Sequence, residues 1–73
     1  MKMLEALIEH VLDDLGPGIY TIRILTDAVN GKMRYPRWSS HHVADKLKQN
    51  PRVQYSGRQH GHAKGSSLWE VVA

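Results

Sequence analysis

Hydrophobic side chains recur every three or four positions over residues 3–15, which is the spacing of a helix with one buried face. Glu5, Glu9 and Asp13 fall four residues apart on the opposite face, where they predict an acidic ridge. The sequence Gly-Pro-Gly then ends the helix, since glycine suits the left-handed position after a helix and proline cannot extend one. The apolar arc covers about half of the circumference. This width indicates either a thoroughly buried central helix or a second apolar surface, such as a dimer contact.

A second helix is predicted after a short segment with the composition of a strand. Residues 19–22 are β-branched or aromatic, so one or two of them can be extended. Thr21 can also cap a helix that runs from Ile22 to Val29 and closes at Asn30-Gly31. The eight residues from Gly31 to Trp38 contain three basic side chains, a proline and two large aromatic residues. We expect them to form an ordered connection.

The stretch SSHHVADKLKQN, residues 39–50, has the clearest helix start in the chain. Ser39 can accept a hydrogen bond from the first turn, and Trp38 is spaced to pack on Val43. Asn50-Pro51 ends the helix. Its apolar stripe is narrow, so the rest of the helix is predicted to form an outward-facing polar surface. That surface contains His41, His42, Asp45, Lys46, Lys48 and Gln49.

After Pro51 the hydrophobic period changes from 3.6 residues to two, which is typical of strands. Arg52–Ser56 and Leu68–Val72 are the two predicted strands, paired as an antiparallel hairpin. The polar, glycine-containing segment Gly57–Ser67 is predicted to be the loop between them. Its basic side chains and histidines are Arg58, His60, His62 and Lys64.

Length and composition favour one small domain spanning residues 1–73. The absence of cysteine excludes disulfides and thiolate metal sites. The sequence has neither an apolar run long enough to cross a bilayer nor the hydrophobic region of a signal peptide. We therefore expect a soluble intracellular protein that is cytoplasmic and nucleoid-associated or, in a eukaryote, nuclear.

Charge is sorted along the chain. Residues 1–30 contain five acidic and two basic side chains, a net charge of −3, whereas residues 31–73 contain eight basic and two acidic ones, a net charge of +6. The two halves together give the overall +3. Such a chain is expected to fold with one basic side, and polyanions are the usual partners of a basic side.

The order of the predicted elements resembles the winged-helix branch of the helix-turn-helix superfamily over Met3–Val72. The segments WSSHHVADKLKQNPRVQY and LWEVV carry this resemblance. It implies an α+β fold, in which three helices precede a two-stranded antiparallel hairpin called the wing, and it leaves room for a short third strand before the second helix. It also implies that the third helix lies in the DNA major groove, while the wing lies along the backbone or in the minor groove.

Two features depart from that family pattern. The connection between the second and third helices is longer than a tight helix-turn-helix turn. The third helix also has no arginine, the residue that most often reads guanine.

Candidate DNA contacts come from the connection, the third helix and the wing. Glutamine can bond adenine, serine and histidine can bond bases or phosphates, and basic side chains neutralise phosphate. Asp45 fits only where it meets a cytosine amine. Each candidate can instead be an ordinary solvated surface residue. The candidates are Arg34, Arg37, Ser40, His41, His42, Lys46, Gln49, Arg58, His60, His62 and Lys64.

Two other kinds of site find little support in the sequence. The histidine pairs at 41–42 and at 60 and 62 raise the hypothesis of a metal site, but adjacent helical side chains diverge by about 100°. We therefore expect neither a metal nor another cofactor. No serine or aspartate has the base and orienting group that catalysis needs, so we expect no enzyme.

The aromatic residues are interpreted mainly as core. Trp38, Trp69, Tyr20 and Tyr55 are expected to pack in the core instead of forming stacking platforms for bases. For Tyr35, a hydroxyl contact to DNA and a place at the edge of the core are equally compatible with the sequence.

The sequence thus predicts a protein that binds double-stranded DNA, either a small transcriptional regulator or an accessory DNA-binding factor, with the acidic ridge facing away from the DNA. The chief alternative is a winged-helix protein-interaction module in a larger assembly, with helix 3–15 as the contact to a partner or a second copy. Binding of RNA or single strands is the third reading. No membrane partner is expected.

Overall fold

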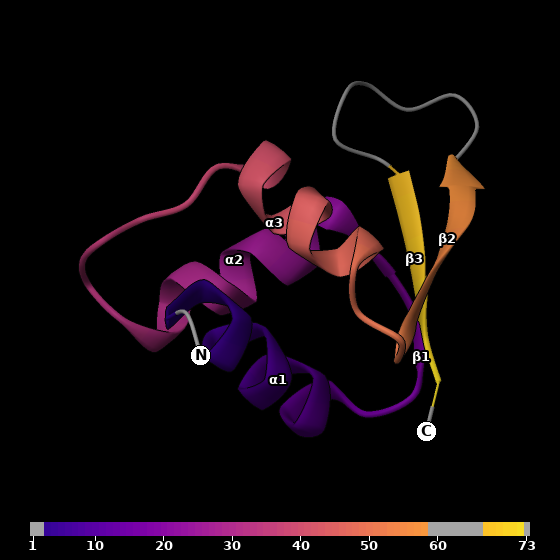
Figure 1. The fold of residues 1–73 in the computed structure, drawn as a ribbon, viewed down its shortest axis with the longest axis horizontal. Coiled ribbons are helices and arrows are strands. Elements are labelled where there is room, and N and C mark those ends of the chain that lie inside the picture. Colours follow the sequence, from indigo (N-terminus) through magenta and orange to yellow (C-terminus); the bar gives the residue numbers. More distant parts are fainter. Residues whose placement is uncertain (1–2, 59–66, 73) are drawn as a thin grey trace.

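The chain folds into three helices and a three-stranded antiparallel sheet, which confirms the predicted α+β class (Figure 1). The computed structural model describes residues 3–58 and 67–72. None of the helices in that part of the chain has the length and apolar character needed to cross a membrane. In chain order the elements are α1 (Met3–Leu15), β1 (Gly18–Thr21), α2 (Ile22–Lys32), α3 (Ser40–Lys48), β2 (Val53–Arg58) and β3 (Ser67–Val71).

Helix α1 contributes one apolar face to the core. Its apolar residues Leu4, Ile8, Val11 and Leu12 are all at most 7% exposed, so the core uses most of the wide apolar arc. The helix ends at Leu15. The next residue, Gly16, has a φ of 79°, the left-handed conformation that favours glycine, and its N–H donates to the Leu12 carbonyl. The predicted Gly-Pro-Gly stop is therefore confirmed.

Helix α2 begins where predicted and ends later than predicted. Thr21 is the last residue of β1 and also caps α2, because its hydroxyl accepts from the Ile24 N–H at 3.1 Å. The expected closure at Asn30-Gly31 is wrong, since α2 continues to Lys32. Asn30 is only 8% exposed, and its side chain accepts from the Trp38 N–H at 2.8 Å and donates to the Trp38 carbonyl at 2.9 Å. Asn30 therefore acts as an anchor for the returning chain and does not end the helix.

The sheet has the strand order β1-β3-β2, with both neighbours antiparallel to β3. The two hairpin strands were predicted correctly to within one or two residues at their ends. Arg52 lies before β2 because its N–H is bound by the Asn50 side chain in the turn after α3. A register shift between Tyr55 and Gly57 bends β2, and Gly57 has a φ of 103°, which other residues rarely adopt.

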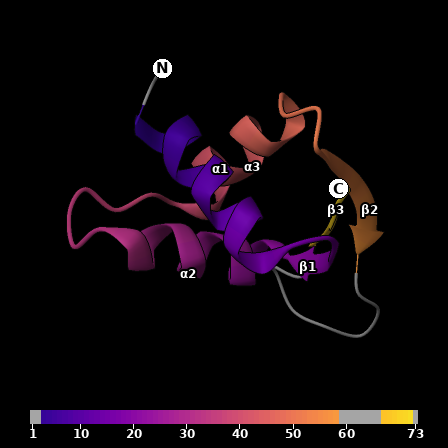
Figure 2. The ribbon, with the colours of Figure 1, turned by 90° about the horizontal axis from the view of Figure 1, so that it is seen from below.

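The core lies between the three helices and the inner face of the sheet (Figures 1 and 2). Val43 of α3 is fully buried and Trp69 of β3 is 2% exposed. Trp38 and Tyr20 pack against this core as predicted. Tyr55 only partly fits its prediction, because its ring contacts Trp69 edge-to-face at 5.2 Å while 57% of the residue is exposed. Tyr35 is 81% exposed, so the core-edge reading of this residue is wrong.

Candidate nucleic-acid interface

The orientation of α3 is fixed by its cap and by two buried side chains. The Ser39 hydroxyl accepts from the His42 N–H at 3.3 Å, which confirms the predicted cap. Val43 and Leu47 are both at most 1% exposed, so one stripe of the helix is held in the core. The polar side of α3 therefore has to face outward.

Most of the predicted α3 contacts are on this outward face. Asp45 and Lys48 are also exposed on this face. Asp45 lies near its middle, opposite Val43 and Leu47. These side chains can reach a ligand without any rearrangement of the core. The exposed candidates on α3 and at its end are Ser40, His41, His42 and Gln49.

Lys46 differs from the other α3 candidates. Its side chain is 24% exposed, and its ammonium group lies 3.2 Å from the Glu5 carboxylate of α1. This ion pair occupies the side of α3 that borders α1. One residue of the acidic ridge of α1, Glu5, thus adjoins an edge of the α3 surface.

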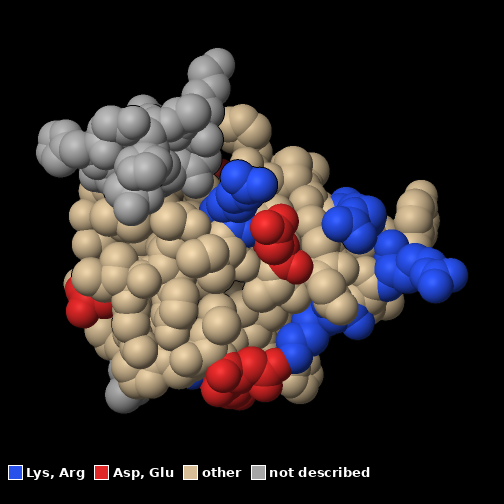
Figure 3. All heavy atoms as spheres, turned by 180° about the vertical axis from the view of Figure 1, so that it is seen from behind, with Lys and Arg blue, Asp and Glu red and all other residues tan. Residues whose placement is uncertain are grey.

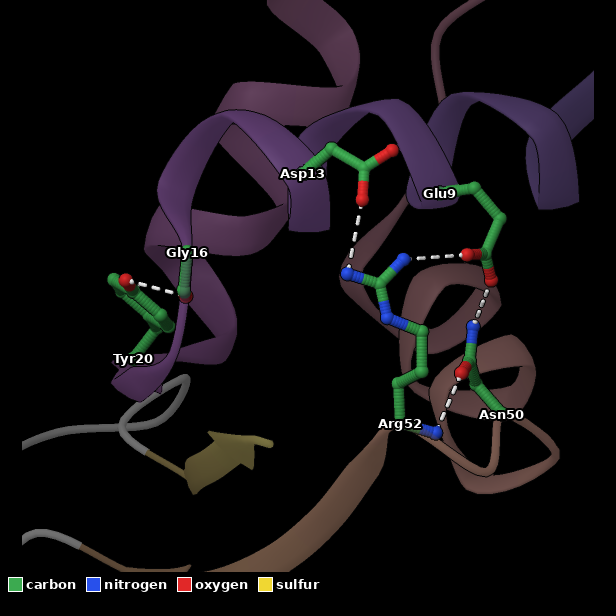
Figure 4. A network of polar contacts seen from close by, with 6 residues as sticks. All are labelled: Glu9, Asp13, Gly16, Tyr20, Asn50 and Arg52. Atoms are coloured by element: carbon green, nitrogen blue, oxygen red, sulfur yellow. Dashed lines mark hydrogen bonds and ion pairs between the residues drawn. The ribbon is translucent and has the colours of Figure 1, made fainter. Parts of the chain in front are cut away.

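The same ridge holds the turn after α3 (Figure 4). The Glu9 carboxylate accepts from the Asn50 amide at 2.6 Å and from the Arg52 guanidinium at 2.8 Å. Asp13 lies 2.9 Å from the other terminal nitrogen of Arg52. Hydrogen bonds from Arg52 to Glu9 and then to Asp13 hold the pKa of Arg52 above its usual value. These hydrogen bonds and ion pairs therefore join α1 to the α3–β2 turn, a role that was not predicted from the sequence.

An open groove of about 820 Å³ separates the start of α1 from α3. Met3, Leu4, Pro36 and Trp38 provide its apolar part. Polar side chains of the α3 face provide the rest, namely His42, Asp45, Lys46, Lys48 and Gln49. A ligand on the α3 face would therefore meet apolar surface beside the polar contacts.

The connection between α2 and α3 extends beyond the helices at one end of the molecule (Figures 1 and 2). Arg34 and Arg37 are both exposed, and neither forms an ion pair with a residue that the structure describes. Figure 3 shows Lys and Arg side chains projecting from this end. The two arginines are therefore available to an external anion, unlike Lys46 and Arg52.

Comparisons with protein-family models, with curated proteins and with solved structures found no match for the chain. Its function is therefore inferred from its own geometry and charge.

The described part of the predicted wing belongs to the two strands of the hairpin. β2 follows α3 and packs against it, and its last residue, Arg58, pairs with Ser67 of β3. The remaining wing candidates, His60, His62 and Lys64, lie outside the described residues. Within residues 3–58 and 67–72, no three histidine, aspartate or glutamate side chains are grouped so as to hold a metal ion.

Proposed function

We propose that this protein is a winged-helix protein that binds double-stranded DNA, as a small transcriptional regulator or an accessory DNA-binding factor. In this proposal α3 lies in the major groove and the β2–β3 hairpin is the wing. The order of three helices and a β2–β3 hairpin, with the short strand β1 before α2, fits the winged-helix arrangement that the sequence resembles. The observation that carries the proposal is the exposed polar face of α3. In the chain it follows two exposed arginines that form no ion pair with a described residue, and it precedes the hairpin.

The dimensions of α3 suit this role. An α-helix with its side chains is about 10–12 Å across, and the major groove of B-DNA is about 12 Å wide, so the groove admits a helix such as α3. Its N-terminus favours phosphate, because the first backbone N–H groups point outward there. Ser40, His41, His42 and Gln49 offer hydrogen bonds to base edges, while Asp45 requires a cytosine amine.

The charges of the interface fall into two groups in this proposal. Arg34 and Arg37 contact phosphates, whereas Lys46 stays paired with Glu5 and is not counted among the phosphate contacts. With about four to six phosphate contacts, including those from the wing, log K should fall against log salt with a slope of roughly −4 to −5.

The protein-interaction alternative depended on spare apolar surface along α1. The core takes most of that arc, and only Met3 and Leu15 remain among its large exposed hydrophobic residues. Duplex binding through α3 is therefore the better-supported function.

A titration of the isotopically labelled protein with a generic DNA duplex tests the proposal. Backbone amide shifts are recorded at low and at near-physiological salt. We expect shifts concentrated in residues 34–49 and 57–65 and weakened by salt, while β1 serves as the internal control and stays unchanged. A spectrum that does not change even at low salt would refute duplex binding.

A further inference from the structure

Tyr35 is the most exposed of the large hydrophobic residues described in the structure, at 81%. A single exposed apolar side chain is common on protein surfaces and by itself indicates nothing. Tyr35, however, lies within three residues of two exposed arginines, Arg34 and Arg37, which form no ion pair with a described residue. The connection therefore presents an open aromatic ring together with two available positive charges.

The connection is firmly held where it returns to the body of the protein. Asn30 binds both the N–H and the carbonyl of Trp38, at 2.8 Å and 2.9 Å. Trp38 packs against the core, and Pro36 is half-buried. The segment that follows Tyr35 is therefore fixed to the body of the protein. Binding residues are commonly found on loops that a rigid scaffold positions in this way.

An exposed aromatic residue with two arginines close to it in the chain offers groups that complement a nucleobase and its phosphates. Proteins bind single strands by stacking aromatic side chains on bases and by neutralising the backbone with basic residues. Bases inside a duplex are already stacked on their neighbours, so an unpaired base is the one whose face is free to meet the ring.

We propose that Arg34, Tyr35 and Arg37 form a binding site for an unpaired base that adjoins the DNA duplex. Tyr35 stacks on the base, and the two arginines hold phosphates on either side of it. This inference rests on the proposed function and adds the class of DNA that the protein prefers, namely a duplex with a single-stranded flank.

The length of the connection limits where that base lies. Tyr35 is four residues before Ser39, the cap of α3, so the two are at most about 14 Å apart along the chain. Successive nucleotides of a B-form strand rise about 3.4 Å along the helix axis. The unpaired base should therefore lie within about four nucleotides of the base pairs that the start of α3 contacts.

Fluorescence anisotropy with two DNA probes tests this inference. One is a blunt duplex, and the other is the same duplex with a four-nucleotide single-stranded tail on either strand. The wild-type protein should bind the tailed duplex more tightly by about fivefold or more, and Tyr35→Ala should abolish the difference. Tyr35→Phe retains the ring and should retain the preference. Ile19→Ala, which removes another exposed hydrophobic side chain, is the matched control and should bind both probes like the wild type.

A fluorescent base analogue in the tail reports stacking directly. Its emission should be quenched by the wild-type protein and by Tyr35→Phe, and should recover with Tyr35→Ala. Equal affinity of the wild-type protein for the two probes, or an equal loss for both in Tyr35→Ala, would overturn the stacking site and leave duplex binding intact. Binding of the tailed duplex without any binding of the blunt duplex would refute the proposed function, whereas binding of neither probe would overturn both.

Discussion

Arg37 and Arg52 lie just outside opposite ends of α3, in contrasting surroundings. Arg37 precedes the helix, is exposed, and makes no ion pair with any described residue. Arg52 follows the helix, and its side chain is 33% exposed between the carboxylates of Glu9 and Asp13. The comparison shows that positive charge in a sequence is divided between residues that hold the fold together and residues that remain free to bind.

The backbone on each side of α3 is held by one asparagine, and the two asparagines differ in how deeply they are buried. Asn30 fixes the returning connection through the N–H and the carbonyl of Trp38, and it is 8% exposed. Asn50 fixes the turn after α3 through the Arg52 N–H and Glu9, and it is only half-buried. Water can replace the bonds of Asn50 more easily than those of Asn30, so the connection depends more strongly on its asparagine.

Substituting the two asparagines should give the largest difference in stability between the two ends of α3. Asn30→Ala leaves a partly buried donor and acceptor of Trp38 without partners, so the free energy of unfolding should fall by about 2 kcal/mol. Asn50→Ala should cost about 1 kcal/mol. Urea unfolding curves measure both values from their midpoints at constant slope. Equal losses of unfolding free energy would show that Asn30 and Asn50 contribute equally to stability.

The charges at the two ends should differ in how they respond to salt. In the proposed DNA complex, Arg37→Ala removes one phosphate contact, so the slope of log K against log salt should become shallower by about 1. The double variant Glu5→Gln/Lys46→Gln removes both partners of an ion pair and leaves the net charge unchanged. Its slope should stay close to that of the wild type. The measurement is a series of duplex affinities over a range of salt concentrations.

If Arg37→Ala and Glu5→Gln/Lys46→Gln reduced the salt slope equally, the proposed difference between free and paired charges would be wrong. It would mean that Lys46 leaves Glu5 and contacts phosphate when DNA binds. The structure then describes only the charge distribution of the free protein, and the α1 border of α3 belongs to the interface.

The parts of the fold that the sequence predicted well depend on near neighbours. Thr21 and Ser39 act on N–H groups three residues ahead, and Gly16 closes a turn with Leu12. Local chemistry of this kind can be recognised in a single sequence, because the spacing itself specifies the partner.

The parts that the sequence did not predict depend on distant partners. Arg52 and Glu9 are separated by 43 positions, and no periodic pattern joins them. Asn30 looked like the end of α2 because asparagine before glycine commonly ends helices. Its actual role depends on Trp38, eight residues away, and follows only from the path of the connection. For the site, the sequence predicted exposed residues on α3 but not that Lys46 is paired with α1.

The ion pair between Lys32 and Asp14 gives the smallest expected effect and extends the comparison to acid pH. Lys32, the last residue of α2, pairs with Asp14 near the end of α1. The hydrogen bond from Lys32, and then its charge, lower the pKa of Asp14 below its ordinary value of 3.8. Because the folded state favours the ionised carboxylate, the pair stabilises the protein above about pH 3.8, and this contribution is lost as the pH falls through the lowered pKa.

Lys32→Met should therefore slightly reduce the fall of the unfolding free energy at acid pH. We expect the wild type to lose more unfolding free energy than the variant between about pH 5 and about pH 2, measured by urea unfolding at each pH. The difference should be small because both side chains are substantially exposed, at 36% and 60%. Parallel curves for the two proteins would show that Asp14 gains nothing from Lys32 in solution. The start of the connection would then be held by Asn30 and the core without help from this ion pair.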